Sequence, residues 1–222
     1  MAVSRAIDSK VAGRSMLSHP FYRAWTEGRL PLDTLRAYAR QYFHHVEAFP
    51  RAVSAVHSQC DDRDGRRMLT ENLAEEEGIE PGKQDHSSLW LMFARGLGES
   101  EVAIRGAPLN PETEALIETF RRLSRRSYAS GLGALYAYES QFPGVAKAKI
   151  EGLVENYGIK DEETLRFFRV HETADVEHSC VCRNLLDRLP EKDREEAIAA
   201  GEELAGALWN FLSGVEARTV VN

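Results

Sequence analysis

Apolar residues recur at steps of three and four along most long segments of this 222-residue chain, and the alternation typical of a β-strand is not found. This spacing places the apolar side chains on one side of an α-helix, so it indicates amphipathic helices packed around a common core. The sequence therefore predicts an all-α fold. Proline and glycine mark the joints, and helices are expected near residues 5–17, 20–27, 32–58, 63–77, 86–97, 111–127, 129–142, 144–157, 161–188 and 191–218.

The composition is that of an ordinary globular protein with one core. No linker, repeat or low-complexity segment divides the chain, so residues 1–222 are expected to form a single-domain helical bundle. Hydrophobic residues make up 43% of the sequence, and no stretch approaches the roughly 18 consecutive apolar residues of a membrane span. The first residues lack the pattern of a secretory signal. We therefore expect a cytoplasmic protein that does not insert into a membrane.

Charge and cysteine content narrow the possible functions. The net charge of −7 argues against nucleic acid as a partner, because neutralising phosphates requires a basic face. The one basic cluster, at residues 121–126, is interpreted as the solvated side of a helix in preference to a binding patch. The cysteines are odd in number, and the last two would point to different sides of a helix. Reduced thiols are therefore expected at Cys60, Cys180 and Cys182, and neither a disulfide nor a metal pair.

The segment 161–188 carries an apolar stripe whose middle is charged. Its members follow at steps of three and four residues and are Leu165, Phe168, His171, Asp175, His178, Cys182, Leu185 and Leu189. A carboxylate and two imidazoles that face a core cost several kcal/mol of desolvation unless a partner compensates for it. A bound cation is one such partner. The other interpretations are a satisfied hydrogen-bond network and a stripe that faces water.

Two further acids lie where apolar residues are expected. Glu139 is on the apolar side of the predicted helix 129–142, and Glu76 is on the apolar side of an earlier helix. His86 begins the next predicted helix, and it can meet Glu76 if the intervening loop folds back. Taken singly, Glu76 belongs to a charge run at residues 75–77 and is equally compatible with a solvated helix end.

Taken together, three carboxylates and three histidines from four helices match the ligands of a non-haem di-iron or iron–manganese site in a bundle core. The predicted ligands are Glu76, His86, Glu139, His171, Asp175 and His178. Their three negative charges leave a small positive charge on two divalent ions, which suits the binding of peroxide or superoxide. The remaining histidines of the long third helix are interpreted as structural: His44, His45 and His57.

Motifs spread along the chain resemble those of a known family. They are H-P-F-Y at 19–22, A-F-P at 48–50, E-N-L-A-E-E-E at 71–77, L-Y-A-Y-E-S-Q at 135–141 and H-E-T-A-D-V-E-H at 171–178. From about residue 10 to 215 the sequence resembles the chlamydial protein associating with death domains (CADD) and its folate-related bacterial relatives. The resemblance implies the haem-oxygenase-like helical fold shared with TenA and PqqC proteins, with a dinuclear metal centre in place of haem.

The same resemblance implies an oxidoreductase that makes 4-aminobenzoate for folate from one of its own tyrosines, with a lysine as amino donor. The matching residues are Tyr22 in F-Y-R-A-W, a second redox-active tyrosine, Tyr38, in A-Y-A-R-Q-Y, and Lys149 in V-A-K-A-K-I. Helical spacing and burial alone give weaker support for these roles. Tyr38 is on an inward stripe, where a tyrosine is usually part of the core. Lys149 shares a side with apolar residues, so it has either a lowered pKa or a snorkelling side chain.

The metal ligands implied by the resemblance are the six residues already named. The implied cofactors are two divalent ions, Fe/Fe or Fe/Mn, with O2 and an external reductant as co-substrates. The loop before His86 is longer here than in the chlamydial relative, so Glu75 and Glu77 remain alternatives to Glu76 as the first ligand. An electron donor is required, and a homodimer is expected by analogy with the fold.

Two other functions are compatible with the sequence. The first is an oxidase of the same fold that acts on a diffusible small molecule. Thiaminase II and pyrroloquinoline-quinone synthase also have this fold, but they act without a dimetal site. The six predicted ligands therefore disfavour these two activities. The second is a protein-interaction module of the death-domain type. No host-binding segment is recognisable in the sequence, and that function leaves the buried ligands unexplained.

Overall fold

The computed structural model describes residues 2–219, except for the side chains of Thr173, Ala174, Glu177 and Thr219; residue 1 and residues 220–222 of the expected domain lie outside the described residues. Within this range the chain forms α-helices, two short 3-10 turns and no strand, so the all-α prediction is confirmed. The helices are α1 (Val3–Val11), α2 (Pro20–Thr26), α3 (Leu32–Ser58), α4 (Arg63–Glu76), α5 (His86–Gly96), α6 (Glu101–Arg105), α7 (Pro111–Arg126), α8 (Tyr128–Glu139), α9 (Phe142–Asn156), α10 (Glu162–Asp187) and α11 (Glu191–Thr219).

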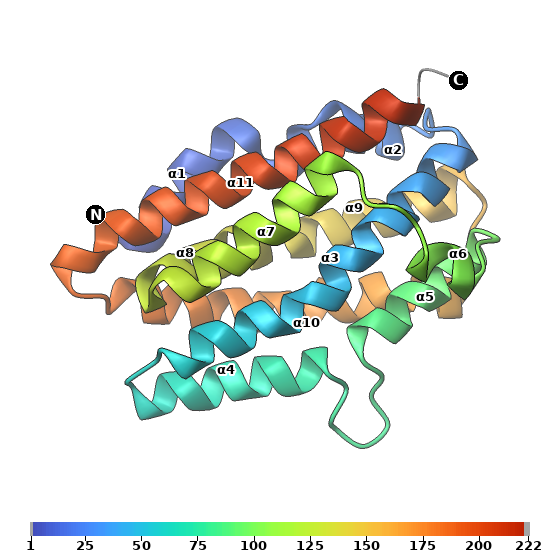
Figure 1. The fold of residues 1–222 in the computed structure, drawn as a ribbon. Coiled ribbons are helices and arrows are strands. Elements are labelled where there is room, and N and C mark those ends of the chain that lie inside the picture. The colour runs from blue at the N-terminus through green and yellow to red at the C-terminus, as the bar shows by residue number, and fades with distance from the viewer. Residues whose placement is uncertain (1, 220–222) are drawn as a thin grey trace.

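The long helices pack into a bundle around one aromatic-rich core (Figure 1). Helix α11 packs against α8 and α7, α3 packs against α7, and α10 crosses the molecule in contact with α9, α5 and α8. Helix α4 lies along α3, and the loop that follows it projects from the bundle before α5 begins (Figure 1). Trp25, Tyr38, Trp90 and Phe168 are fully buried between these helices. No helix in the described range is both long and apolar enough to cross a bilayer.

Two local expectations are wrong. The first expected helix, 5–17, ends at Val11 and continues as 3-10 turns at Ala12–Arg14 and Met16–Ser18. The backbone is extended at Ser15, which interrupts the helical hydrogen bonding. The short helix α6 was not expected; Ser100 caps it by accepting a hydrogen bond from the Ala103 N–H.

Two glycines allow close approaches between segments of the backbone. Gly78, with φ of 62°, ends α4, and a Cβ there would lie 2.3 Å from the backbone nitrogen of Asp85. The loop between α4 and α5 therefore folds back on itself, which is the condition under which Glu76 was expected to meet His86. Gly133 lets α8 approach α11, because a Cβ there would lie 2.0 Å from the Ala197 carbonyl oxygen.

Candidate metal centre

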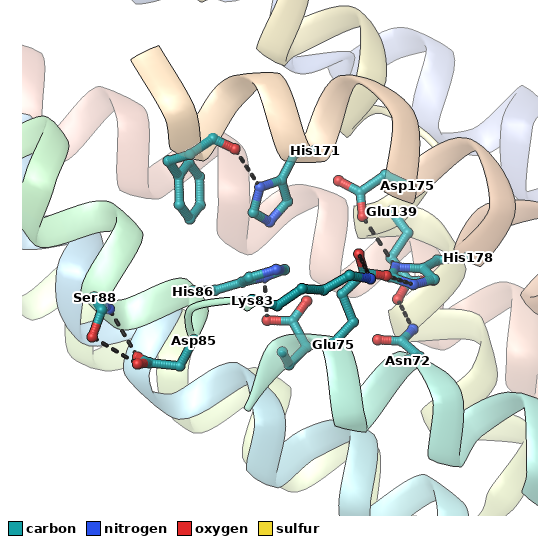
Figure 2. A network of polar contacts seen from close by, with 12 residues as sticks. Asn72, Glu75, Lys83, Asp85, His86, Ser88, Glu139, His171, Asp175 and His178 are labelled. Carbon is teal, nitrogen blue, oxygen red and sulfur yellow. Dashed lines mark hydrogen bonds and ion pairs between the residues drawn. The ribbon is translucent and has the colours of Figure 1, made fainter. Parts of the chain in front are cut away.

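The charged stripe of α10 faces the interior. His171, Asp175 and His178 are only 4%, 2% and 8% exposed. Figure 2 shows these side chains, with Glu139 from α8 and His86 from α5, directed toward a common region beside the end of α4. The interpretation of a stripe facing water is therefore excluded.

One group of three ligands comes from α4, α5 and α10. Glu76, His86 and His171 are all buried, and one ligand atom from each lies within 4.8 Å of the others. Asp85 caps α5 by accepting the Ser88 N–H, which positions His86 at the first turn of that helix. His171 Nδ1 is 2.7 Å from the carbonyl oxygen of the residue one turn earlier, so donation of its N–H there leaves Nε2 free for a metal.

The other three predicted ligands adjoin this group. His178 Nδ1 lies 3.5 Å from Asp175 Oδ1, and Glu139 interacts electrostatically with both residues. Glu139 is fully buried, and its two oxygens accept hydrogen bonds from Asn72 Nδ2 at 2.8 Å and from Cys182 Sγ at 3.1 Å. These contacts hold the carboxylate at the interior end of α8.

The three consecutive glutamates at the end of α4 have different surroundings. Glu76 is buried, with Oε2 2.7 Å from His86 Nδ1, whereas Glu77 is exposed. Glu75 is partly exposed; one oxygen lies 3.1 Å from His178 Nε2 and the other 3.4 Å from Lys83 Nζ. The structure thus brings Glu76 to the ligand group, and it adds Glu75 as a neighbour of His178 that the predicted set did not contain.

Several buried polar atoms of this centre lack a hydrogen-bond partner in the described part of the chain. They are Asp175 Oδ2 and the Nδ1 atoms of His86 and His178, whose contacts with Glu76 and Asp175 have the distances of ion pairs but not the geometry of hydrogen bonds. An unsatisfied buried polar atom costs about 1–3 kcal/mol, and the partner that suits both carboxylate oxygens and imidazole nitrogens is a divalent cation. The hydrogen-bond network of the centre is therefore incomplete in the described residues, and the residues fit a bound metal.

The pKa values of the residues in the centre also favour a bound cation. Burial raises the pKa of Asp175 to about 7 and also raises the pKa of Glu139, and neighbouring carboxylates add to both shifts. Burial lowers the pKa of His178, but the adjacent carboxylates have the larger combined effect and raise this pKa to about 9. Burial lowers the pKa of His171, which keeps that imidazole neutral as a ligand must be. Without an ion, the raised pKa values of Asp175 and Glu139 favour protons on these two acids.

A second buried cluster contains the tyrosines and the lysine. Tyr22 Oη lies 3.1 Å from Tyr38 Oη, and Lys149 Nζ donates to Tyr38 Oη at 2.7 Å. Lys149 is fully buried, and its Nζ is 5.5 Å from the centre of the Tyr22 ring and 4.9 Å from that of Tyr38. The structure thus brings together the three residues that the resemblance singled out, including Tyr22, for which helical spacing gave no argument.

The surroundings of Lys149 disfavour the charged form of its amine. It forms no ion pair with a described carboxylate, and burial lowers the pKa of its amine well below the usual value. The snorkelling interpretation is therefore wrong, because Nζ does not reach solvent. A neutral amine carries the lone pair that a nitrogen nucleophile needs.

Replacing Lys149 with methionine tests this directly. Between its lowered folded pKa and the unfolded value of 10.5, the unfolded chain binds a proton that the folded chain does not. The free energy of unfolding of the wild type therefore rises with pH across that window, by up to about 1.4 kcal/mol per unit. Lys149→Met should be more stable than the wild type near neutral pH, and the difference should shrink toward pH 10 in urea titrations. A difference independent of pH would mean that Lys149 is charged in the folded protein.

Two tyrosines connect the clusters, and the sequence analysis missed them. The Tyr42 ring stacks on Tyr38 at 5.3 Å, and Tyr42 Oη lies 2.7 Å from Tyr138 Oη. Both Tyr42 and Tyr138 interact electrostatically with Asp175. Their positions in the sequence could have indicated them, since Tyr42 lies four residues after Tyr38 and Tyr138 directly precedes Glu139. Buried tyrosines are usually core residues, however, so these positions did not single them out.

The contacts of Asn72 and Cys182 with Glu139 were also missed. Each lies one helical turn from a predicted ligand, Asn72 before Glu76 and Cys182 after His178, so both belong to the inward sides of their helices. The expectation of free thiols is confirmed at all three cysteines. Cys182 nevertheless adjoins the centre, because its thiol donates to the Glu139 carboxylate.

A cavity of about 580 Å³ leads to the centre from the surface, with His86 and His178 in its wall. Lys83, on the loop that projects after α4, also lines it, as does the exposed Arg166 of α10. The centre is therefore accessible to ions and small molecules although its ligands are buried.

Comparison with known proteins assigns the chain to a family. The profile of a family described as iron-containing redox enzymes matches residues 36–210. The chain belongs to this family. A 4-aminobenzoate synthase of Nitrosomonas europaea is 40% identical to it, over 97% of this chain and 92% of that protein. A 4-aminobenzoate synthase of Chlamydia muridarum is 39% identical, over 93% of this chain and 86% of that protein. The resemblance to the CADD-like family is thereby confirmed.

The iron-containing redox enzyme family also accounts for the architecture. A solved TenA homologue from P. horikoshii superposes with a TM-score of 0.79 at 13% identity, over 97% of this chain and 98% of that one. At this identity the likeness establishes the haem-oxygenase-like fold and nothing about activity. As a family member the chain is an oxidoreductase, and the buried group of Glu76, His86 and His171 is where it can bind metal.

Proposed function

We propose that this protein makes 4-aminobenzoate, that it uses the ring of its own Tyr22, and that Lys149 supplies the amino nitrogen. The observation that carries the proposal is the buried cluster in which Tyr38 contacts both the Tyr22 hydroxyl and the Lys149 amine. The names of the relatives at 39% and 40% identity support the product. Folate synthesis is the pathway that such a product serves.

Tyr22 is suited to donate an electron and a proton inside the protein. It is 2% exposed, and burial raises the pKa of its hydroxyl well above the usual value. The hydroxyl therefore stays protonated, and its proton can pass only to its hydrogen-bond partner, Tyr38. Loss of an electron and a proton leaves an oxidised ring on which the Cα–Cβ bond can break. Conversion of Cβ to the carboxyl carbon of the product requires further oxidation, for which O2 is the electron acceptor, and two oxygen atoms, which come from O2 or water.

Lys149 is suited to deliver nitrogen. Aromatic rings surround its Nζ, water does not reach it, and the Tyr22 ring centre is 5.5 Å away. In the oxidised ring the carbon that carried the hydroxyl is a carbonyl carbon; the lone pair of the amine adds to it, and the oxygen leaves as water. The lysine Cε–N bond is then oxidised by two electrons to an imine, with O2 as the electron acceptor, and hydrolysis releases the aromatic amine and leaves an aldehyde at Cε. A protein consumed in this way is closer to a reagent than to a catalyst.

The oxidising equivalents are proposed to come from two metal ions. Glu76, His86 and His171 would hold one ion, and Glu139, Asp175 and His178 the other, as iron with iron or manganese. When bound, and with an external reductant, this centre supplies the activation of O2 that tyrosine oxidation requires. Tyr138 and Tyr42 lie between the ligands and Tyr38, so they can carry the electron hole toward Tyr22. The free thiols are consistent with a reducing, cytoplasmic compartment.

Tyr38→Phe is expected to slow product formation at least about tenfold, equivalent to about 1.4 kcal/mol on the barrier. The ring remains, but the hydroxyl that connects Tyr22 with Lys149 is lost. Product per chain should be followed over time by liquid chromatography and mass spectrometry. Tyr157→Phe, which removes a hydroxyl bonded to the Leu30 N–H away from the cluster, is the control and should react like the wild type. Equal rates in both variants would remove Tyr38 from the reaction.

Product analysis of purified protein tests the function as a whole. Protein given iron, manganese, a reductant and O2, with no organic substrate, should form less than or about one 4-aminobenzoate per chain. An oxidase of a diffusible substrate would form none until that substrate is added. A pure interaction module would form none and would not bind metal at Glu76, His86 and His171.

A further inference from the structure

Most of the predicted metal ligands do not line the cavity that leads to the centre. The described wall of this cavity contains two of the six, His86 and His178. The other four lie behind this wall and are at most 4% exposed: Glu76, Glu139, His171 and Asp175. An ion that enters through the cavity therefore meets an imidazole before it reaches the inner carboxylates.

His178 contacts one carboxylate on each side of this boundary. Its Nδ1 lies 3.5 Å from Oδ1 of the buried Asp175 and has no hydrogen-bond partner among the described residues. Its Nε2 lies 3.1 Å from Oε2 of Glu75, which lines the cavity and has a side chain that is 20% exposed. Because a neutral imidazole binds a metal through either nitrogen, His178 can serve an ion on the cavity side and an ion in the centre.

The spacing of Glu75 and His178 fits a cation held by both. Two ligand atoms that are each about 2.1 Å from an ion, at right angles to each other, are about 3.0 Å apart. The Glu75 and His178 atoms are 3.1 Å apart, and carboxylate oxygen with imidazole nitrogen suits divalent iron or manganese. Glu71 and Glu80 also line the cavity, but Glu75 is the described wall carboxylate that reaches a predicted ligand.

Lys83 places a competing positive charge at the same point. It lies on the loop that projects after α4, and its Nζ is 3.4 Å from Oε1 of Glu75 and 3.0 Å from Oε2 of Glu80. Figure 2 shows Lys83, Glu75 and His178 meeting beside the end of α4. A cation that binds Glu75 must compete with this ammonium group for the carboxylate and is repelled by it.

We propose that Glu75 and Nε2 of His178 form an entry site, which binds a divalent cation in the cavity and passes it inward to Asp175 and Glu139, and that Lys83 opposes this step. Glu75 then acts before the final ligands and does not replace Glu76 among them. The proposal rests on the metal centre of the proposed function, but it is independent of the fate of Tyr22.

Uptake of Mn²⁺ by metal-free protein tests the entry site without turnover. The protein is mixed with Mn²⁺ alone, without reductant or O2, uptake is stopped with a chelator at increasing times, and bound metal is measured by elemental analysis after rapid desalting. Glu75→Gln should take up Mn²⁺ about tenfold more slowly, because a carboxylate in a cavity raises the local concentration of cations. Lys83→Met should take it up about threefold faster, because the competing charge is gone.

Glu77→Gln is the matched control. It removes the same charge two residues further on, from an exposed side chain that is not in the cavity wall. Its rate of uptake should equal that of the wild type. Glu75 and Lys83 are partly exposed, so none of these variants requires the core to repack.

The rate of release separates an entry site from a permanent ligand. A residue that lowers the barrier to entry also lowers the barrier to exit, so Glu75→Gln should release bound Mn²⁺ into excess chelator more slowly than the wild type. Loss of a permanent ligand has the opposite effect, because it weakens the final site and speeds release. At saturating Mn²⁺, Glu75→Gln should bind as much metal per chain as the wild type.

Several results would overturn the proposal. Uptake at the wild-type rate by Glu75→Gln or by Lys83→Met would remove that residue from the path, and faster release from Glu75→Gln would make Glu75 a permanent ligand. Equal slowing in Glu77→Gln would reduce the effect to the total charge of the protein. If the wild type takes up neither Mn²⁺ nor Fe²⁺, the metal centre of the proposed function fails together with its entry site. If the wild type loads normally and Glu75→Gln does the same, the entry site fails alone.

Discussion

Tyr22→Phe is expected to abolish 4-aminobenzoate formation while the protein stays folded and binds metal. The phenyl ring fills nearly the same space, and only the hydrogen bond to Tyr38 is lost. That loss costs about 1 kcal/mol of unfolding free energy. The phenolic O–H, whose removal gives the oxidised ring, is absent, so the defect is chemical. Product per chain after exposure to metal, reductant and O2 is the measurement.

Tyr136→Phe is the matched control for this variant. Tyr136 is also fully buried, and the change removes its hydroxyl hydrogen bonds, to Asp8 at 2.9 Å and from Arg183 at 3.3 Å, but the residue lies away from Lys149 and Tyr38. It should make as much product as the wild type. Wild-type product in Tyr22→Phe would refute self-sacrifice at this position and would require a search for a diffusible substrate.

Asp175→Ala and His178→Ala are each expected to abolish product and to lower the metal content below the wild-type level. Replacing even residues that only support ligands typically costs 10–100-fold in metal affinity, so loss of a ligand should cost more than about 100-fold. Metal content after dialysis measures this by elemental analysis. Glu172→Ala, on the same helix but ion-paired with Arg169 at the surface, is the control.

The stability of these variants has no fixed sign. Removing a buried charge also removes its desolvation cost, so a metal-free variant can be more stable than the metal-free wild type. Metal content separates the outcomes: if both Asp175→Ala and His178→Ala retain the wild-type content, these residues do not bind the second ion.

The sequence predicted most of the fold because periodicity is a local property. The stripe on α10 identified His171, Asp175 and His178 as inward residues, since helical spacing alone determines which side they share. The bend after Val11 and the short α6 were not predicted, because they depend on individual capping and turn contacts. Choosing among Glu75, Glu76 and Glu77 required the path of the loop back to His86.

Side-chain contacts between different helices could not be predicted from the sequence either. Glu75 beside His178, Cys182 beside Glu139, and Tyr42 beside Tyr138 join residues from different helices, and such contacts are determined by how the helices pack. Tyr22 was assigned through the resemblance, and its contact with Tyr38 gives that assignment a physical basis.

The central claim is that Tyr22 itself becomes the product. Protein grown on ring-labelled tyrosine should be exposed to iron, manganese, a reductant and O2, and its peptides and released small molecules compared by mass spectrometry before and after. We predict labelled 4-aminobenzoate together with loss of the side chain from the peptide that contains Tyr22, in equal amounts. Labelled or unlabelled 4-aminobenzoate formed while Tyr22 remains intact would contradict the account.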